Sequence, residues 1–469
     1  MTRLAASWAL GLAALGALGL APAHAAAEPP DSGGATTVHI VDASAFSLPA
    51  ANLPMTRLAD FFAGNSFFTN AWVRAPASAS ARDGLGPLFN TNSCQSCHLK
   101  DGRGQPPAPG AELVSMLVRA SVPARTAAER ALERTAGAVP DPRYGDQIQN
   151  RAVEGVPPEA HAALTWQDVP GRFGDGTSYT LQRPSVQLAA LAYGPLDPEL
   201  RLSARVAPPL VGMGLLERIP EAAIAALADP DDRDGNGISG RTNQVWDAAR
   251  GASALGRFGW KAGQPTLRQQ VAAAFRGDLG ITSSLFPEQP CTPVQSACAQ
   301  APSGGAPELA DEVLDLVTFY AQTLGVPARR NPSTARPGEA LFRALGCAGC
   351  HVERFVTGPA PDAQTALSLL ADQEIHPYSD LLLHDMGEGL ADGRPEFGAD
   401  GREWRTPPLW GIGLVHAVSR HTRFLHDGRA RNLEEAILWH GGEAEPARRA
   451  YTALQRSERD QLLFFLGTL

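Results

Sequence analysis

Apolar residues recur at helical spacing in two stretches that lie far apart in the chain. The apolar side chains recur within each turn of the expected helix, which predicts a buried helical face. We therefore expect two buried helices, each closing a larger unit of the chain. The first carries Val313, Leu316, Val317, Tyr320 and Leu324, and the second carries Leu462, Leu463, Phe465 and Leu466.

The units that these helices close share an order of motifs. The pair Leu88-Phe89 stands about five residues before a cysteine motif, and Leu341-Phe342 stands at the same interval before a second one. We expect each pair to end a helix that leads into the motif. Further along each unit, residues 205–215 resemble residues 405–414. The common order indicates an internal duplication.

A proline-containing linker at 327–337 predicts the boundary between the units, which we place at 26–330 and 335–469. The first unit is longer because of insertions near 105–180 and 225–305. These insertions are rich in Gly, Pro, Asp and Arg, so we expect loops, short strands and a few helices. The predicted fold is mainly α, with an N-terminal unit enlarged by loop-rich insertions.

The first 25 residues have the pattern of an export signal. Arg3 supplies a positive charge, residues 9–21 are apolar, and Ala23-His24-Ala25 offers a small-x-small cleavage site. We expect residues 1–25 to be removed and the protein to be periplasmic; the alternative is an uncleaved anchor. No later stretch approaches the length of a membrane span, so none is expected in the mature chain.

The charge balance is acidic and narrows the choice of partners. The chain has 49 Asp and Glu residues against 40 Lys and Arg residues, a formal net charge of −9. Loss of Arg3 with the signal would make it more negative by one. Such a balance argues against nucleic acid as a partner.

Four of the six cysteines lie in two copies of Cys-x-x-Cys-His, the attachment signature of c-type haem. The two thiols of each copy bond to the haem vinyl groups, and the adjacent imidazole binds the iron. We therefore predict two covalently bound haems and two cytochrome c-like haem domains. The attachment residues are Cys94, Cys97 and His98 in the first copy, and Cys347, Cys350 and His351 in the second.

Two cysteines remain after the haem motifs are counted. Cys291 and Cys298 are seven residues apart and could close a short disulfide loop in an oxidising compartment. The alternative is a pair of free or redox-active thiols.

The C-terminal region resembles the corresponding segment of bacterial di-haem cytochrome c peroxidases. His426-Asp427-Gly428 precedes a run that begins Leu433-Glu434-Glu435-Ala436. In those proteins a distal iron ligand follows fourteen residues after the His of His-Asp-Gly, a position occupied here by His440. The resemblance implies a second haem bound by His351 and His440, six-coordinate and suited to electron transfer. Alternatively, His440 only caps a helix end.

The first haem has no histidine at a spacing that marks a distal ligand. The peroxidases place an acid near the start of a helix to handle peroxide protons, and the internal repeat puts Glu221 at that point, with Glu217 one turn earlier. Either acid could instead be an ordinary helix-start carboxylate. Met213 and Met386 are alternative thioether ligands. The Gln-Phe-Trp-Asp-Gly-Arg run of the peroxidases is replaced by residues 212–217, which argues against simple peroxidase activity.

Three further runs resemble the di-haem oxidoreductase family, whose members are also labelled peroxidases and thiol oxidoreductases. These runs are residues 82–89, 101–104 and 379–390. The resemblance implies a periplasmic di-haem oxidoreductase with peroxidase-like activity, an electron-transfer C-terminal haem and a catalytic N-terminal haem. Its expected partners are a small periplasmic electron donor or acceptor protein and peroxide or another small oxidant. The alternative is a non-enzymatic di-haem electron carrier.

An acidic turn offers a candidate calcium site. Asp232, Asp234 and Asn236 are spaced as in the first half of an EF-hand loop, with Gly235 and Gly237 in the turn. The related peroxidases hold calcium between their haem domains, so Ca²⁺ is a candidate ligand here. The alternative is a solvated acidic turn.

Overall fold

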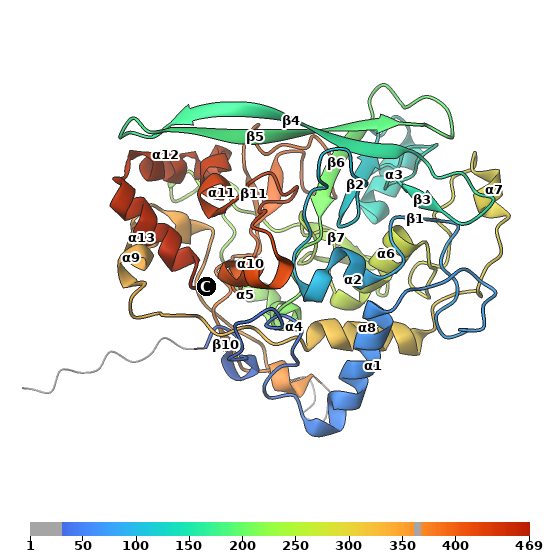
Figure 1. The fold of residues 1–469 in the computed structure, drawn as a ribbon, viewed down its shortest axis with the longest axis horizontal. Coiled ribbons are helices and arrows are strands. Elements are labelled where there is room, and N and C mark those ends of the chain that lie inside the picture. Colours follow the sequence, from blue (N-terminus) through green and yellow to red (C-terminus); the bar gives the residue numbers. More distant parts are fainter. Residues whose placement is uncertain (1–30, 361–366) are drawn as a thin grey trace, which may run out of the picture.

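A computed structural model of the chain describes residues 31–360 and 367–469, so the expected signal segment 1–25 lies outside the described residues. Short helices and strands alternate along this part of the chain (Figure 1). The helices are α1 (Leu58–Thr69), α2 (Cys94–Cys97), α3 (Ala127–Ala136), α4 (Met213–Arg218), α5 (Glu221–Ala225), α6 (Leu267–Leu279), α7 (Ser296–Ala299), α8 (Asp311–Gln322), α9 (Arg336–Ala344), α10 (Val415–Ser419), α11 (Leu433–Trp439), α12 (Glu445–Ala453) and α13 (Arg456–Leu466). The strands are β1 (Leu88–Phe89), β2 (Met116–Ser121), β3 (Arg151–Ala152), β4 (His161–Arg172), β5 (Ser178–Ala189), β6 (Arg201–Val206), β7 (Gln244–Asp247), β8 (Ala252–Leu255), β9 (Phe355–Val356), β10 (Glu374–Ile375), β11 (Leu383–Asp385) and β12 (Glu403–Arg405).

The prediction of a mainly α fold is wrong. Only 30% of the structure is helical and 18% is strand, and the strands of the described part pair as six two-stranded antiparallel sheets. The insertions form paired strands because their Gly- and Pro-rich turns separate segments of alternating polarity. Leu88-Phe89, expected to end a helix, is strand β1 and pairs with β3.

The two helices predicted from apolar spacing are confirmed as α8 and α13. Helix α8 packs on α1 and α6, whereas α13 packs on α9, which leads into the second cysteine motif. The two packed groups lie on different sides of the molecule (Figure 1). No helix within 31–360 and 367–469 has both the length and the apolar character to cross a membrane.

The internal repeat is visible in the backbone. Arg205 lies in β6 and Arg405 in β12, and each strand leads through a Pro-Pro-Leu run to a glycine. Gly212 and Gly411 have φ values of +69° and +73°, in the left-handed region that favours glycine. Each glycine starts a short helix at the equivalent point of its unit.

A long hairpin joins the two halves of the molecule. Strands β4 and β5 pair over twelve residues each and cross the top of the molecule in Figure 1, reaching over α11 and α12. At the tip, Gly174 N donates to Thr452 O at 2.8 Å, and Asp175 pairs with the buried Arg459 at 2.9 Å. The guanidinium of Arg459 also lies 4.0 Å from the ring centroid of Phe173. An insertion of the N-terminal half thus clamps the C-terminal helices.

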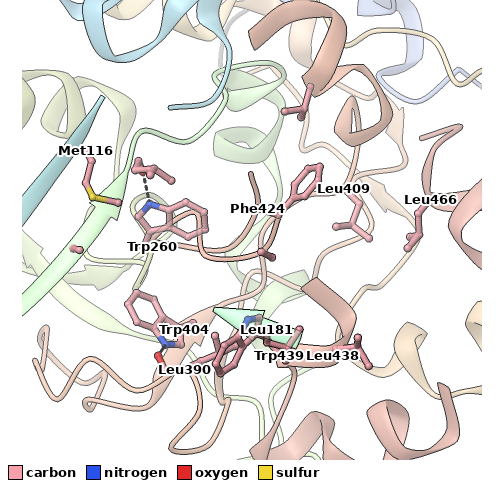
Figure 2. Close-up of a cluster of buried hydrophobic side chains, with 14 of the residues drawn as sticks. Met116, Leu181, Trp260, Leu390, Trp404, Leu409, Phe424, Leu438, Trp439 and Leu466 are labelled. Atoms are coloured by element: carbon pink, nitrogen blue, oxygen red, sulfur yellow. Dashed lines mark hydrogen bonds between the residues drawn. The ribbon is translucent and has the colours of Figure 1, made fainter. Parts of the chain in front are cut away.

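The largest buried apolar cluster draws on both halves of the chain. Its members come from segments on either side of the predicted boundary, so the two units share one core. The division into 26–330 and 335–469 therefore stays a prediction. Figure 2 shows Met116, Leu181 and Trp260 of the N-terminal half beside Leu390, Trp404, Leu409, Phe424, Leu438, Trp439 and Leu466 of the C-terminal half.

We expect Arg459→Ala to lower the free energy of unfolding by about 2–3 kcal/mol, because it removes a buried ion pair and a cation–π contact together. Arg456→Ala, one turn earlier on α13, is the matched control: the Arg456 side chain is 73% exposed and forms a surface ion pair with Asp460. This control should cost less than about 0.5 kcal/mol. Denaturant unfolding of both variants measures the difference, and equal costs would contradict the clamp.

Candidate functional site

The first Cys-x-x-Cys-His motif presents a neutral imidazole. Its cysteines lie in α2, whose N-terminus is capped by the Ser93 hydroxyl. His98 follows, and its Nδ1 donates to Pro208 O at 2.8 Å. Because a carbonyl only accepts, Nδ1 carries the proton and Nε2 keeps its lone pair. Burial lowers the pKa of His98 to about 4. The side chain is therefore in the form that binds a metal.

The second motif repeats this arrangement. Cys347 begins a short 3₁₀ helix, Cys347–Gly349, and His351 Nδ1 donates to Tyr378 O at 2.8 Å. Burial lowers the pKa of His351 to about 4 as well. Each imidazole also has a phenylalanine ring 6.2 Å away between centroids: Phe68 at His98 and Phe342 at His351. Both histidines are thus oriented by a carbonyl group that is far from the motif in the sequence and by a neighbouring aromatic ring.

A cavity of about 330 Å³ opens beside the second motif. Cys347, Cys350 and His351 line it, together with residues from the N-terminal half. Pro208 is one of these, and its carbonyl is the acceptor for His98. One loop therefore contacts the first motif and forms part of the cavity at the second, which places the two motifs close together in space.

His440 lies on the same cavity. It is the C-cap of α11, and its Nδ1 donates to Ala436 O at 2.6 Å, which leaves Nε2 with a lone pair. Burial lowers the pKa of His440. This is the ligand-ready form found at His98 and His351, although its role as distal ligand stays a prediction. Met213 and Met386 also line the cavity and remain alternatives.

The lining of the cavity fits a covalently held haem. It combines two thiols, a neutral imidazole beside them and a mostly apolar wall that includes Leu409 and Ile437. When bound there, a haem would be attached through Cys347 and Cys350 and bound at the iron by His351. The first motif carries the same donor set, but its own residues, Cys94, Cys97 and His98, are not part of this cavity's lining.

Two buried arginines also line the cavity. Arg103 is 8% exposed and Arg405 is 4% exposed. Burial lowers the pKa of each guanidinium to about 10. Arg103 donates from Nε to Arg423 O at 2.8 Å and from Nη2 to Leu425 O. Arg405 donates to Gly259 O at 3.0 Å and to Thr406 O at 3.2 Å.

A histidine clamped between two carboxylates borders Cys350. His384 Nε2 lies 2.8 Å from Asp380 Oδ2, its Nδ1 lies 2.7 Å from Glu443 Oε2, and Cys350 Sγ is 3.6 Å from Nδ1. Burial alone would lower the pKa of His384, but the bonds to Asp380, Cys350 and Glu443 outweigh it and raise the pKa to about 12. His384 is therefore a buried imidazolium at the edge of the cavity.

Glu443 extends this cluster to the N-terminal half. Its carboxylate accepts from Ser239 N at 3.0 Å, from Ser239 Oγ at 2.9 Å and from Asp385 N at 3.0 Å. Glu443 follows His440 by three residues, so the turn after the candidate distal ligand is anchored to both halves. Sequence reasoning placed Asp380 and His384 in a family run without giving either a role. It missed Glu443, because this partner is 59 residues from His384 in the chain.

The His-Asp-Gly histidine stacks on a tryptophan. The rings of Trp404 and His426 are 3.7 Å apart between centroids and tilted by 10°. Lys261 Nζ lies 4.4 Å from the Trp404 centroid and pairs with Asp392 at 3.0 Å. Trp404 and His426 both line the cavity. The stack fixes one wall of the site.

The two predicted catalytic acids lie away from this cavity's lining. Glu217 accepts from Leu267 N at 2.7 Å and from Gln322 Nε2 at 2.6 Å, so both of its oxygens hold neighbouring helices. Glu221 is exposed at the start of α5. Their catalytic roles stay predictions.

A different acid lies near the first motif. The backbone carbonyl of Asp278 accepts from Asn90 N and Thr91 N, just before α2. Its carboxylate accepts from Gln147 Nε2 at 2.8 Å, and burial raises its pKa. Asp278 acts on the motif electrostatically, since after burial it is the next cause of the raised pKa of Cys94 and Cys97. It has no sequence signal of its own.

The candidate calcium loop lies at the rim of the cavity, which Asn236 lines. Its side-chain oxygens hold the turn itself. Asp232 Oδ1 accepts from Gly237 N at 3.0 Å, Asp234 Oδ1 from Asn236 N at 3.1 Å, and Asn236 Oδ1 from Ile238 N at 2.7 Å. Calcium binding stays a prediction.

The two cysteines outside the haem motifs form a disulfide. Cys291 and Cys298 are joined, with Cα atoms 5.8 Å apart. The loop between them presents Gln295, which donates to Glu159 Oε1 at 2.6 Å. Of the two possibilities that the sequence left open for these cysteines, the structure shows the disulfide.

We expect His384→Gln to cost more stability at low pH than at high pH. The unfolded pKa is about 6.5 and the folded pKa is higher, so the stabilisation is complete below about pH 6.5 and declines as pH rises towards 12. The difference in free energy of unfolding between wild type and variant should shrink by about 1.4 kcal/mol for each pH unit above 6.5. Denaturant unfolding at several pH values measures it. His39→Gln, at an exposed histidine, should give no such trend, and a pH-independent cost for His384→Gln would contradict the clamped imidazolium.

Comparison with known proteins identifies the family. The model of the family described as "Di-haem oxidoreductase, putative peroxidase" matches residues 26–174 and 173–469. No curated protein matches the chain, and no solved structure does. The family match spans nearly all of the chain after the expected signal and confirms the resemblance seen in the sequence. The chain therefore belongs to the di-haem oxidoreductase family.

Proposed function

We propose that this protein is an exported, periplasmic di-haem c-type oxidoreductase with peroxidase-like activity. The haems would be attached through Cys94 and Cys97 and through Cys347 and Cys350. One observation carries the proposal: both motif histidines have Nδ1 committed to a backbone carbonyl and Nε2 available. Family membership supports the oxidoreductase class. The signal-like N-terminus and the c-type motifs support export.

The two sites have different roles in this proposal. When bound, the haem irons accept and release single electrons, and an iron with an open position also binds small oxidants. His351 and His440 would close the second site from both sides, which suits electron transfer. His98 has no sequence-marked partner at the first site, so the iron bound there would keep a position open for a small oxidant such as peroxide. A calcium ion in the 232–238 turn would sit beside the second site.

In this proposal a carboxyl group donates the proton that the reaction with peroxide needs at the first site. Glu217 and Glu221 are the sequence candidates, but Glu217 uses both oxygens to hold neighbouring groups and Glu221 is exposed. Asp278 is partly buried and acts electrostatically on Cys94 and Cys97, and burial raises the pKa of its carboxyl group, which favours the protonated form that a proton donor needs. We therefore assign the proton donor to Asp278.

A small periplasmic redox protein would exchange electrons with the second site. The acidic net charge favours a partner with a complementary basic face and disfavours nucleic acid. Pro208 accepts a hydrogen bond from His98 and also lines the cavity of the second motif, which supports direct transfer between the two sites.

We expect His440→Ala to convert one haem from a low-spin to a high-spin signal. The substitution removes the imidazole that would fill the sixth position of the second iron. Optical and EPR spectra of the oxidised protein measure this change. His416→Ala, at an exposed histidine of α10, is the control and should leave the spectrum unchanged. A spectrum of His440→Ala identical to wild type would reject the assignment.

We expect the half-reduced protein to react with hydrogen peroxide, and Asp278→Asn to slow that reaction by about a hundredfold through loss of the proton donor. Glu217→Gln and Glu221→Gln serve as matched comparisons and should react at near wild-type rates. Stopped-flow absorbance measures all four rates. Slowing confined to Glu221→Gln would return the role to the sequence candidate. Two low-spin irons that ignore peroxide would support an electron carrier instead.

A further inference from the structure

Arg103 and Arg405 are buried cations without a carboxylate partner in the described residues. Most other buried cations have one: Arg205 and Lys261 pair with Asp392, Arg394 with Glu396, Arg429 with Asp427, and Arg459 with Asp175. The partners of Arg103 and Arg405 are instead neutral backbone carbonyls. A buried guanidinium without a counter-charge is costly, since desolvation is not repaid by attraction. Arg257, which is 6% exposed and donates to Leu216 O at 3.1 Å, also has no ion pair within the described residues, but it lies off the cavity. Arg103 and Arg405 are the two unpaired arginines on the cavity lining.

Both charges lie on the cavity of the second motif. The other charged side chains on its lining are already paired: Arg448 with Glu445, and His384 with Asp380 and Glu443. Within residues 31–360 and 367–469, Arg103 Nη1 and Arg405 Nη2 donate to no acceptor. Each guanidinium thus keeps one nitrogen that can donate to a ligand bound in the cavity.

The two arginines flank a single segment of the wall. Arg405 Nε donates to Gly259 O, and the Arg103 guanidinium lies 5.1 Å from the ring of Trp260. Two charges on neighbouring positions suit a ligand that carries two carboxylates along one edge. A haem has this form, because its two propionates leave the same side of the ring.

We propose that Arg103 and Arg405 bind the two propionates of the haem attached at Cys347 and Cys350. This inference rests on the proposed function, because it requires a haem in the cavity. Arg103 follows His98 by five residues, so the segment that carries the first motif also holds the second haem. Charge-assisted bonds from a guanidinium fork fix a carboxylate in place and neutralise it. Neutralised propionates favour the reduced, less positive iron.

The test is the midpoint potential of the second haem in the complete, haem-loaded protein. In Arg103→Gln and Arg405→Gln we expect the reduction equilibrium to shift about tenfold towards the oxidised form, which is a fall of about 59 mV for a one-electron couple. Arg330→Gln is the matched control. Arg330 also donates to two backbone carbonyls, Gly413 O and Gly467 O, but lies off the cavity. It should leave the potential unchanged.

Potentials of Arg103→Gln and Arg405→Gln that equal that of Arg330→Gln would overturn the proposal. If the Gln variants do not fold, Arg405→Lys keeps the charge but loses the fork. The propionate bending band of the second haem in its resonance Raman spectrum should then shift from wild type, and an unchanged band would overturn the proposal.

A free anion is the competing occupant of the two arginines. If it were bound there, added acetate would shift the wild-type potential at constant ionic strength, and that result would also overturn the proposal. Haem content by mass separates this inference from the proposed function. A chain that carries no covalent haem removes the proposed function, whereas a loaded chain with an unmoved potential removes only the role of the arginines.

Discussion

The bond from an imidazole Nδ1 to a backbone carbonyl is the constraint on which the rest of the structure depends. A histidine binds iron only through an unprotonated ring nitrogen, and a hydrogen bond from Nδ1 to a carbonyl leaves Nε2 as that nitrogen. In this chain the acceptors are Pro208 for His98 and Tyr378 for His351, and neither is adjacent to its motif. The fold must bring β6 and its Pro-Pro-Leu loop to the first motif and the segment before β11 to the second. His440 meets the same requirement within its own helix.

Buried charge is the second organising feature. The wall between the two motifs contains an imidazolium held by Asp380 and Glu443, a lysine above Trp404, and several arginines paired with acids. Buried charges are stable only when they are paired or bonded. The paired ones lock segments of the two halves together, as Glu443 does with Ser239. Two of the arginines without an acidic partner in the described residues, Arg103 and Arg405, line the cavity and so belong with the ligand that it binds.

The two halves are interdependent. The hairpin of β4 and β5 belongs to the N-terminal half, yet its tip rests on α12 and α13. The loop ending at Ser239 also belongs to that half, yet it lines the cavity beside the second motif. The second site is therefore not a self-contained cytochrome, and its ligand environment depends on segments more than 100 residues away in the chain. This arrangement couples the two sites through packing and charge.

The sequence by itself determined what depends on short spacing. The Cys-x-x-Cys-His motifs and the helices α8 and α13 could be read locally, because each depends on residues within a few turns. The family followed from several such short runs, and the prediction of His440 as a distal ligand followed from its resemblance to the peroxidases. Fold class could not, because the Gly- and Pro-rich insertions become hairpins only when they find partners such as α12. The roles of Arg103, Asp278, Asp380, Arg405 and Glu443 emerged only in the tertiary structure. Charge pairing and burial are properties of neighbours in space, and the chain brings these neighbours together from separate segments.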